Sequence, residues 1–132
     1  MSSKVVVRTE DAPAPFQGAP YNQAIVANGF VFVAGQLGLE PGGDGVVDGG
    51  IAAQTEQVFK NIKAILAAAG TSIDAVVKTT VFIRNLDDFA SMNEVYASHI
   101  GSTPPARSTV EVGKLPAGAL VEIEVIALAN AD

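Results

Sequence analysis

Three stretches of this sequence carry apolar residues at successive positions, which restricts how the chain can pack: FVFVAG, VVKTTVFI and VIALA. A strand with one solvated face alternates apolar and polar residues, whereas a continuous apolar run is typical of a strand buried on both faces. The rest of the chain offers two helices, which are enough to cover one face of such a sheet but not both. We therefore expect a second copy of the chain to cover the other face, in an oligomer of undetermined size.

The spacing of apolar residues predicts an α+β fold with the element order β, β, β, α, β, α, β, β. Asn28-Gly29 lies between two β-branched and aromatic runs within 24–37, which is a strong hairpin signal. The other strands are expected at 4–10, 75–84, 106–112 and 119–129, and Pro- and Gly-rich loops at 11–24 and 38–50.

Two helices complete the prediction. Apolar residues recur at helical spacing over 51–70, and Gly70 follows as a left-handed stop. The second helix is expected from its cap at Asn85 through Ile100. Polar residues of the first helix fall outside its apolar face, namely Gln54, Gln57, Lys60 and Asn61, and the apolar positions of the second helix are Phe89, Met92 and Tyr96.

Composition limits the possible functions. A chain of 132 residues with 48% apolar and 17% charged residues fits one folded domain, 1–132. No apolar run approaches the ~20 residues that cross a bilayer, and the N-terminus lacks an apolar signal segment, so we expect a cytoplasmic protein. With one histidine and no cysteine we expect neither a metal nor another cofactor. The net charge of −6, with scattered basic residues, makes nucleic acid a poor partner.

Arg107 stands where PPARSTVEV turns into a predicted strand, an unusual place for a permanent charge. Judged by residue type, an arginine more often pairs with a surface acid or covers apolar area with its stem. Alternatively, its planar guanidinium receives a carboxylate through two parallel hydrogen bonds. The residue type alone leaves both roles open.

The last predicted strand alternates apolar residues on one face with Glu122 and Glu124 on the other. On a solvated face two glutamates need no further explanation. Under a covering subunit a carboxylate has to be paired, hydrogen-bonded or functional, and a glutamate in a cleft can activate a water molecule. Glu111 is a weaker candidate of the same kind.

Two further side chains carry polar chemistry. Tyr21, in the loop GAPYNQA, is either a packed aromatic residue or the donor of a hydroxyl to a site. His99 closes the second predicted helix, where a histidine interacts favourably with the helix dipole, so we interpret it as structural.

Together these motifs resemble the reactive intermediate deaminase family, Rid or RidA/YjgF, and match its 2-iminobutanoate/2-iminopropanoate deaminase branch closely. The resemblance extends along nearly the whole chain. It rests on the ordered stretches APYNQA, VFVAGQL, IAAQTEQVFKNIKAILAAAG, VVKTTVFIRNLDDFASMNEVY, PPARSTVEVGKLP and VEIEVIALA.

The resemblance implies a chorismate-mutase-like mixed sheet with two helices on one face, assembled as a homotrimer around a central axis with ligand clefts between subunits. It also implies a metal-independent hydrolase of C–N bonds. Such an enzyme converts 2-imino and 2-enamino acids to 2-keto acids and ammonia, and so protects pyridoxal-phosphate enzymes.

The same resemblance assigns residues. Arg107 matches the residue that holds the substrate carboxylate, and Glu122 matches the residue that positions the hydrolytic water. Tyr21, a third catalytic candidate, and Asn93 match positions that line the cleft, and Gly35 matches a backbone contact to the ligand.

The chain departs from the family pattern near the expected cleft. Ala34 stands where serine is frequent, and Thr109, a further substrate-binding candidate, stands where cysteine is frequent. The segment from Tyr96 to Pro104 is shorter than usual, and GAPY has alanine where glycine is common. These changes bear on the size of substrate that is accepted.

Other functions are compatible with part of this pattern. The same cleft would suit a regulatory protein that binds 2-keto acids without turnover, or a deaminase dedicated to one pathway, such as aminoacrylate or aminomuconate breakdown. A ribonuclease fits poorly, because the chain is acidic and has a single histidine and few aromatic residues for base stacking.

Overall fold

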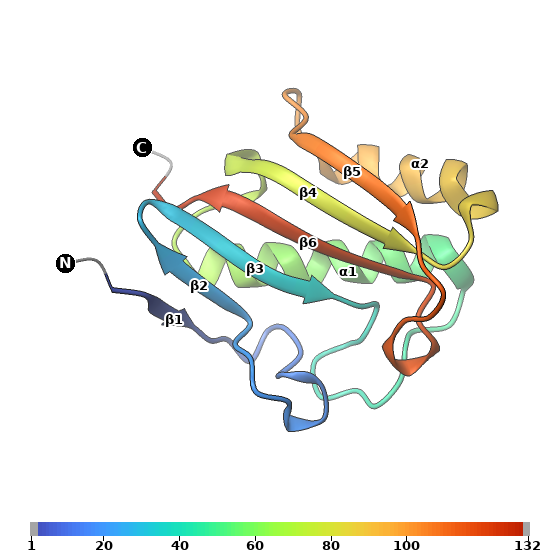
Figure 1. Cartoon of the computed structure of the whole chain (residues 1–132), viewed down its shortest axis with the longest axis horizontal. Coiled ribbons are helices and arrows are strands. Elements are labelled where there is room, and N and C mark those ends of the chain that lie inside the picture. The colour runs from blue at the N-terminus through green and yellow to red at the C-terminus, as the bar shows by residue number, and fades with distance from the viewer. Residues whose placement is uncertain (1–2, 131–132) are drawn as a thin grey trace.

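The structure, a computed structural model, describes residues 3–130. They form a mixed six-stranded sheet with two α-helices on one face, as the sequence predicts (Figure 1). Residues 1–2 and 131–132 of the predicted domain lie outside this description. The elements are β1 Val5–Val7, β2 Ala24–Ala27, β3 Phe30–Gln36, α1 Gly50–Ala68, β4 Val76–Ile83, α2 Phe89–His99, β5 Ala106–Glu111 and β6 Val121–Leu128, with short 3-10 turns between some of them.

The predicted hairpin is confirmed. Strands β2 and β3 pair antiparallel and are joined by Asn28 and Gly29, whose φ angles are 51° and 85°. Positive φ at both central residues is the geometry of a type I′ turn, which asparagine and glycine adopt most readily. The turn therefore fixes the register of the two strands.

The strand order β1-β2-β3-β6-β4-β5 places the last strand of the chain in the middle of the sheet. Strand β6 is antiparallel to both β3 and β4, while β4 and β5 are parallel and are connected through α2. Alternate residues of β6 enter the core, whereas Glu122 and Glu124 face the other way. The predicted alternation of this strand is thus confirmed.

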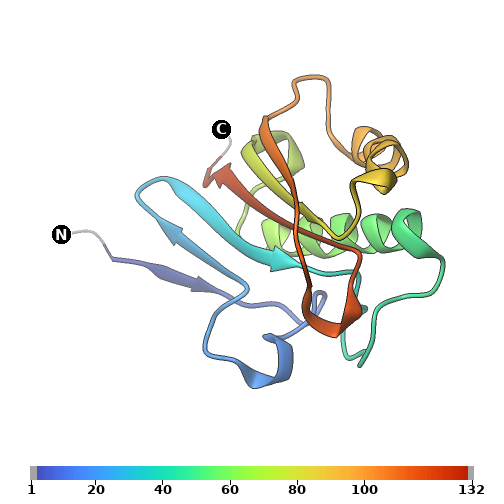
Figure 2. The ribbon, with the colours of Figure 1, turned by 45° about the vertical axis from the view of Figure 1, so that its right-hand side comes forward.

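Helix α1 packs along the sheet and supplies most of the helical side of the core. Its apolar residues fit the predicted spacing, and Gly70, at a φ of 85°, follows the helix end. Both helices lie on the same side of the sheet in the turned view of Figure 2. The fully buried apolar side chains of α1 are Val58, Phe59, Ile62, Ile65 and Leu66.

The second helix begins later than predicted. The side chain of Asn85 does act as a cap, accepting a hydrogen bond of 2.9 Å from the N–H of Asp87, but it caps a 3-10 turn, Leu86–Asp88. Helix α2 starts only at Phe89. The expected burial of Phe89 is wrong, since 39% of its surface is exposed. Its ring lies against Arg107 instead of in the core.

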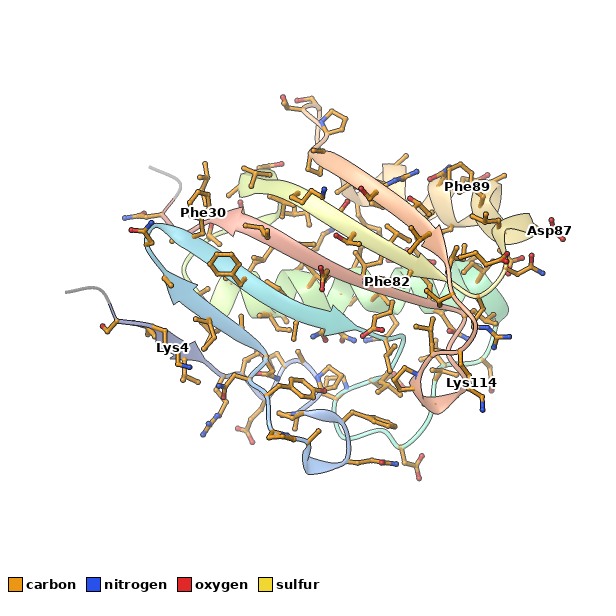
Figure 3. The ribbon with its side chains drawn as sticks, in the orientation of Figure 1. Lys4, Phe30, Phe82, Asp87, Phe89 and Lys114 are labelled. Atoms are coloured by element: carbon orange, nitrogen blue, oxygen red, sulfur yellow. The ribbon has the colours of Figure 1, made fainter. Side chains whose placement is uncertain are left out.

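The face of the sheet turned away from the helices is covered by no element of residues 3–130 (Figure 3). Phe32, Val110 and Leu128 are each 44% exposed. An apolar surface of this kind on a monomer commonly marks an interaction site. The uncovered second face is therefore as the sequence predicts, and within residues 3–130 no helix has the length and apolarity to cross a membrane.

Candidate functional site

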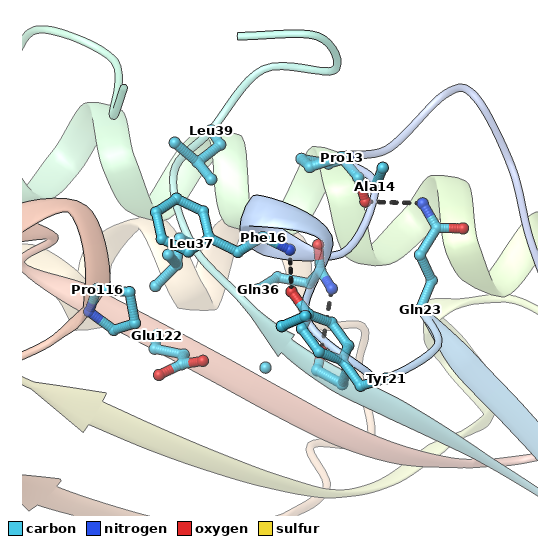
Figure 4. Close-up of a pocket in the computed structure, with 13 residues that line it drawn as sticks. Pro13, Ala14, Phe16, Tyr21, Gln23, Gln36, Leu37, Leu39, Pro116 and Glu122 are labelled. Atoms are coloured by element: carbon cyan, nitrogen blue, oxygen red, sulfur yellow. Dashed lines mark hydrogen bonds between the residues drawn. The ribbon is translucent and has the colours of Figure 1, made fainter. Parts of the chain in front are cut away.

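A cleft of about 360 Å³ lies between the loop that precedes β2 and the ends of β3 and β6 (Figure 4). One end is apolar because Leu37 and Leu39 belong to a small hydrophobic cluster, against which Phe16 packs. The carboxylate of Glu122 also lines the cleft. A cleft with an apolar end and one carboxylate suits a small molecule better than a macromolecule.

Glu122 projects from the second position of β6, opposite Phe82 of β4. Burial, and to a smaller extent the charge of Glu124, raises the pKa of the Glu122 carboxyl above its ordinary value. A carboxyl group with a raised pKa is better suited to exchange protons near neutral pH. Gly35 of β3 lies directly against this carboxylate, and a side chain at position 35 would overlap it.

Tyr21, from the loop that precedes β2, also lines the cleft. Its hydroxyl oxygen accepts a hydrogen bond of 2.6 Å from the backbone N–H of Phe16, so its own proton remains available for a ligand. The loop before it is held by Gln23, whose side-chain nitrogen donates to the carbonyl oxygens of Thr9, Ala12 and Pro13. Tyr21, Gly35 and Glu122 therefore line one cleft.

Arg107 lies elsewhere, between β5 and α2. The carbon of its guanidinium is 4.7 Å from the ring centroid of Tyr96 and 5.5 Å from that of Phe89. Both distances are in the range of cation–π interactions, which hold the guanidinium in place without neutralising its charge. Within residues 3–130 the guanidinium forms no ion pair. The guanidinium of Arg107 is therefore held in position, and its charge remains available to bind an anion.

Two other predicted residues accompany Arg107. Asn93 lies between Phe89 and Tyr96 on one face of α2, at helical spacing, and Thr109 follows Arg107 by two positions on β5. The buried oxygens Oδ1 of Asn93 and Oγ1 of Thr109 have no hydrogen-bond partner in the described part of the chain. Such orphaned polar atoms usually await a water, ligand or neighbouring molecule.

The two groups of predicted residues lie on opposite faces of the sheet. Thr79 of β4 points toward the helices, where its hydroxyl bonds that of Tyr96, and it pairs directly with Arg107. Phe82, three residues further along β4, points the other way and pairs with Glu122. The candidate residues of a single chain therefore fall into two groups, called the arginine half-site (Arg107, Asn93, Thr109) and the glutamate half-site (Tyr21, Gly35, Glu122).

Glu111 and His99 have structural contacts. Glu111 accepts a hydrogen bond of 2.9 Å from the N–H of Leu86 and so ties β5 to the turn before α2. The ring of His99 stacks on Phe59, with Lys63 Nζ 2.8 Å from Nδ1 and a Glu56 carboxylate oxygen 2.9 Å from Nε2. These contacts join α1 to α2. Residues 3–130 contain no cluster of three or more His, Asp or Glu side chains that could hold a metal ion.

Sequence reasoning missed a set of buried amides around the cleft. Gln23, Gln54 and Asn61 are all nearly inaccessible, and each bonds the backbone of a segment that borders the cleft. The one available signal was the position of Gln54 and Asn61 beside the apolar face of α1 rather than opposite it.

Comparison with known proteins is consistent along the chain. The family model described as Endoribonuclease L-PSP matches residues 9–129. A RutC family protein of Pyrococcus horikoshii is 52% identical over 94% of this chain and 97% of its own. The human protein named 2-iminobutanoate/2-iminopropanoate deaminase is 38% identical over 97% of this chain and 93% of its own.

Solved structures agree. RidA from an Antarctic Psychrobacter superposes with a TM-score of 0.88 at 43% identity, covering 94% of this chain and 98% of that one. Escherichia coli TdcF with bound serine gives 0.85 at 37% identity, covering 94% and 98%. The family match, the relatives and the shared fold leave one conclusion. The chain belongs to the Rid (RidA/YjgF) family, which is also described as Endoribonuclease L-PSP.

Proposed function

We propose that the protein is a deaminase that hydrolyses reactive 2-imino acids, and the 2-enamino acids from which they arise, to 2-keto acids and ammonia. The observation that carries this proposal is the pair of half-sites, an unneutralised guanidinium on one face and a carboxyl of raised pKa on the other. The human relative bears the name of such an enzyme. 2-Iminopropanoate and 2-iminobutanoate are the proposed substrates.

The proposal requires that copies of the chain complete the site. In a homotrimer arranged around a central axis, as in a chorismate-mutase-like assembly, the arginine half-site of one copy would face the glutamate half-site of the next. The uncovered apolar face of the sheet supplies a surface for such an assembly. The orphaned oxygens of Asn93 and Thr109 are then placed toward the shared cleft, where a ligand or the neighbouring copy would satisfy them.

In the proposed reaction Arg107 binds the substrate carboxylate and sets the orientation of C2. Because C2 of a 2-imino acid is already electrophilic, positioning and proton transfer suffice and no metal is required. A water molecule attacks C2 while Glu122 accepts its proton. Glu122 then delivers that proton to the nitrogen, which gives a carbinolamine. The proton of the new hydroxyl group passes to the nitrogen, again through Glu122, as the C2–N bond breaks, so ammonia leaves and the carbonyl of the 2-keto acid forms.

The remaining residues assist. Tyr21 would donate a hydrogen bond from its hydroxyl group to the substrate, since its oxygen already accepts from Phe16. The backbone of Gly35, which lies against Glu122, would contact the ligand beside the attacking water. Asn93 and Thr109 would complete the binding of the carboxylate next to Arg107. In the cell we propose a cytoplasmic role that protects pyridoxal-phosphate enzymes from the imines they release.

The test is a coupled assay in which an amino-acid oxidase or a threonine dehydratase generates the imine and semicarbazide traps what remains. Wild type is expected to suppress semicarbazone formation. Arg107→Ala should lose about 10²-fold or more in kcat/KM, because two charge-assisted hydrogen bonds to the substrate are lost. Arg84→Ala is the matched control, since Arg84 is exposed and does not line the cleft. An inactive wild type would refute the proposal.

A second candidate is a binding or regulatory protein that uses the same cleft without turnover. The observation in its favour is the TdcF structure, which holds serine, an amino acid with a carboxylate. If wild type is inert while 2-ketobutyrate raises its melting temperature and Arg107→Ala abolishes that shift, this candidate replaces the first. A panel of imines, including the products of aminoacrylate and aminomuconate pathways, separates a general deaminase from a dedicated one.

A further inference from the structure

One flank of α1, next to its apolar face, is lined by three buried amide side chains: Gln54, Gln57 and Asn61. Their spacing of three and four residues places them in a row along the helix. None of them lines the cleft. A buried amide costs free energy unless its hydrogen bonds are satisfied, so the partners of this row indicate what it does.

Asn61 holds the segment that leaves β3. Its side-chain nitrogen donates to the carbonyl oxygens of Leu37, at 3.1 Å, and Leu39, at 2.9 Å. Gln57 donates to the oxygen of Asn61 at 3.0 Å, which fixes the orientation of that amide. The side chains of Leu37 and Leu39 form the apolar end of the cleft. One amide therefore determines where that wall stands.

Gln54 holds the segment that enters β6. Its side-chain oxygen accepts a hydrogen bond of 2.9 Å from the backbone N–H of Leu120, two residues before Glu122. On its other side the backbone of Gly38 presses against it, so closely that a Cβ at position 38 would lie 2.9 Å from Cβ of Gln54. Gln54 thus contacts both the residue that directly precedes the strand bearing the carboxylate and the segment that bears the apolar wall.

We propose that Gln54 and Asn61 are positioning residues of the cleft, Gln54 acting through Glu122 and Asn61 acting through Leu37 and Leu39. This inference rests on the proposed deaminase function and adds to it a separation of roles. Gln54 sets the distance and angle of the general base to the reacting carbon, which affects kcat. Asn61 sets the pocket for the apolar part of the substrate, which affects KM.

The expected losses of rate follow from how small a displacement of a catalytic group an active site tolerates. A displacement of about 1 Å in a catalytic group can cost roughly 10²-fold in rate. Gln54→Met keeps the volume of the side chain but removes the acceptor for the Leu120 N–H. We expect kcat to fall at least about tenfold with KM within about twofold of wild type, and a bell-shaped pH profile whose acidic limb moves, because the environment of Glu122 changes.

Asn61→Leu removes both donors at similar volume and should give the opposite split. KM should rise about tenfold or more for an imine with a long apolar side chain, such as the one an oxidase makes from leucine, with a smaller change for 2-iminopropanoate. Gln57→Met, which only disorients Asn61, should give the same pattern with a smaller rise.

Two control variants isolate the hydrogen bonds from general effects on the helix. Thr55 is buried beside Gln54, and its hydroxyl has no hydrogen-bond partner within residues 3–130. Thr55→Val should therefore leave kcat and KM unchanged. Gln54→Glu retains an acceptor for Leu120 and should retain most of kcat. Should Gln54→Met not fold, Gln54→Asn withdraws the acceptor by one methylene and carries the same expectation.

A second readout does not depend on turnover. The carboxyl of Glu122 is titrated by carbon-13 NMR and the exchange of the Leu120 amide proton is measured in each variant. In Gln54→Met the midpoint of Glu122 should move and Leu120 should exchange faster, with neither change in Thr55→Val. If the folded Gln54→Met shows the wild-type midpoint, exchange rate and kcat, the proposal is overturned. If wild type proves inactive, the deaminase function fails and the NMR arm alone decides the positioning.

Discussion

Arg107 and Glu122 stand on opposite faces of the same sheet: Arg107 pairs with the helix-facing Thr79 of β4, and Glu122 pairs with the outward-facing Phe82. Strand β4 also lies between β5, which bears Arg107, and β6, which bears Glu122. If both act on one substrate, they come from different copies of the chain. The active site would then exist only where two copies meet, and mixing variants of Arg107 and Glu122 can test this.

Mixing two inactive variants should restore activity. Arg107→Ala damages only the arginine half-site and Glu122→Gln only the glutamate half-site. When the two variants are co-refolded in equal amounts as a cyclic trimer, roughly one quarter of the clefts combine two intact halves. About a quarter of wild-type kcat per cleft is therefore expected in the imine assay. A mixture that stays as inactive as its components would place both residues in one chain's site.

Gly35→Ala should inactivate the protein without unfolding it. The added methyl group overlaps the carboxylate of Glu122, which has to move away from its place in the cleft. We expect kcat to fall by about tenfold or more, since the general base is displaced. Gly45→Ala is the control, because a Cβ there meets no atom within 4 Å. Equal kcat values in the two variants would show that the carboxylate adjusts freely.

Glu124→Gln should shift the pH dependence of the reaction. The pKa of Glu122 is raised first by burial and second by the charge of Glu124. Removing that charge lowers the pKa of Glu122, so the deprotonated base persists to lower pH. The acidic limb of the kcat/KM profile therefore shifts to lower pH. A profile measured from pH 4 to pH 8 tests this. An acidic limb that stays in place would assign it to another group.

Glu122→Gln should stabilise the fold at neutral pH. Because the pKa of Glu122 is higher in the folded state than in the unfolded chain, its contribution to stability is fully present below the unfolded-state pKa and is lost as pH rises through the folded-state pKa. Glutamine mimics the protonated form and avoids that loss. Melting curves should show a higher Tm than wild type at pH 8 and a smaller difference near pH 4. The reverse order would contradict the raised pKa.

Local features of the fold were predictable from the sequence. Asn28-Gly29 specifies a turn of positive φ, and the alternation in VEIEV specifies which residues of the last strand face outward, because both signals involve neighbours in the chain. The start of α2 was missed since Asn85 caps a 3-10 turn as readily as an α-helix, and the side-chain oxygen that caps either is the same.

The division of the site was not predictable in the same way. It depends on β6 entering between β3 and β4 and on β5 pairing parallel to β4, which are long-range choices that periodicity does not record. The family resemblance supplied the residues Arg107 and Glu122, but their faces became known only from the pairing. Likewise the burial of Gln54 and Asn61 depends on loops packed on α1, and their position beside its apolar face does not by itself specify those loops.

The uncovered face of the sheet has a consequence for the folded single chain. A newly folded chain presents Phe32, Val110 and Leu128 to solvent while every strand beneath them is already formed. The species at risk of aggregation is then the folded monomer, not only the unfolded chain. If copies of the chain cover this face, as we propose, assembly competes with aggregation for the same apolar surface.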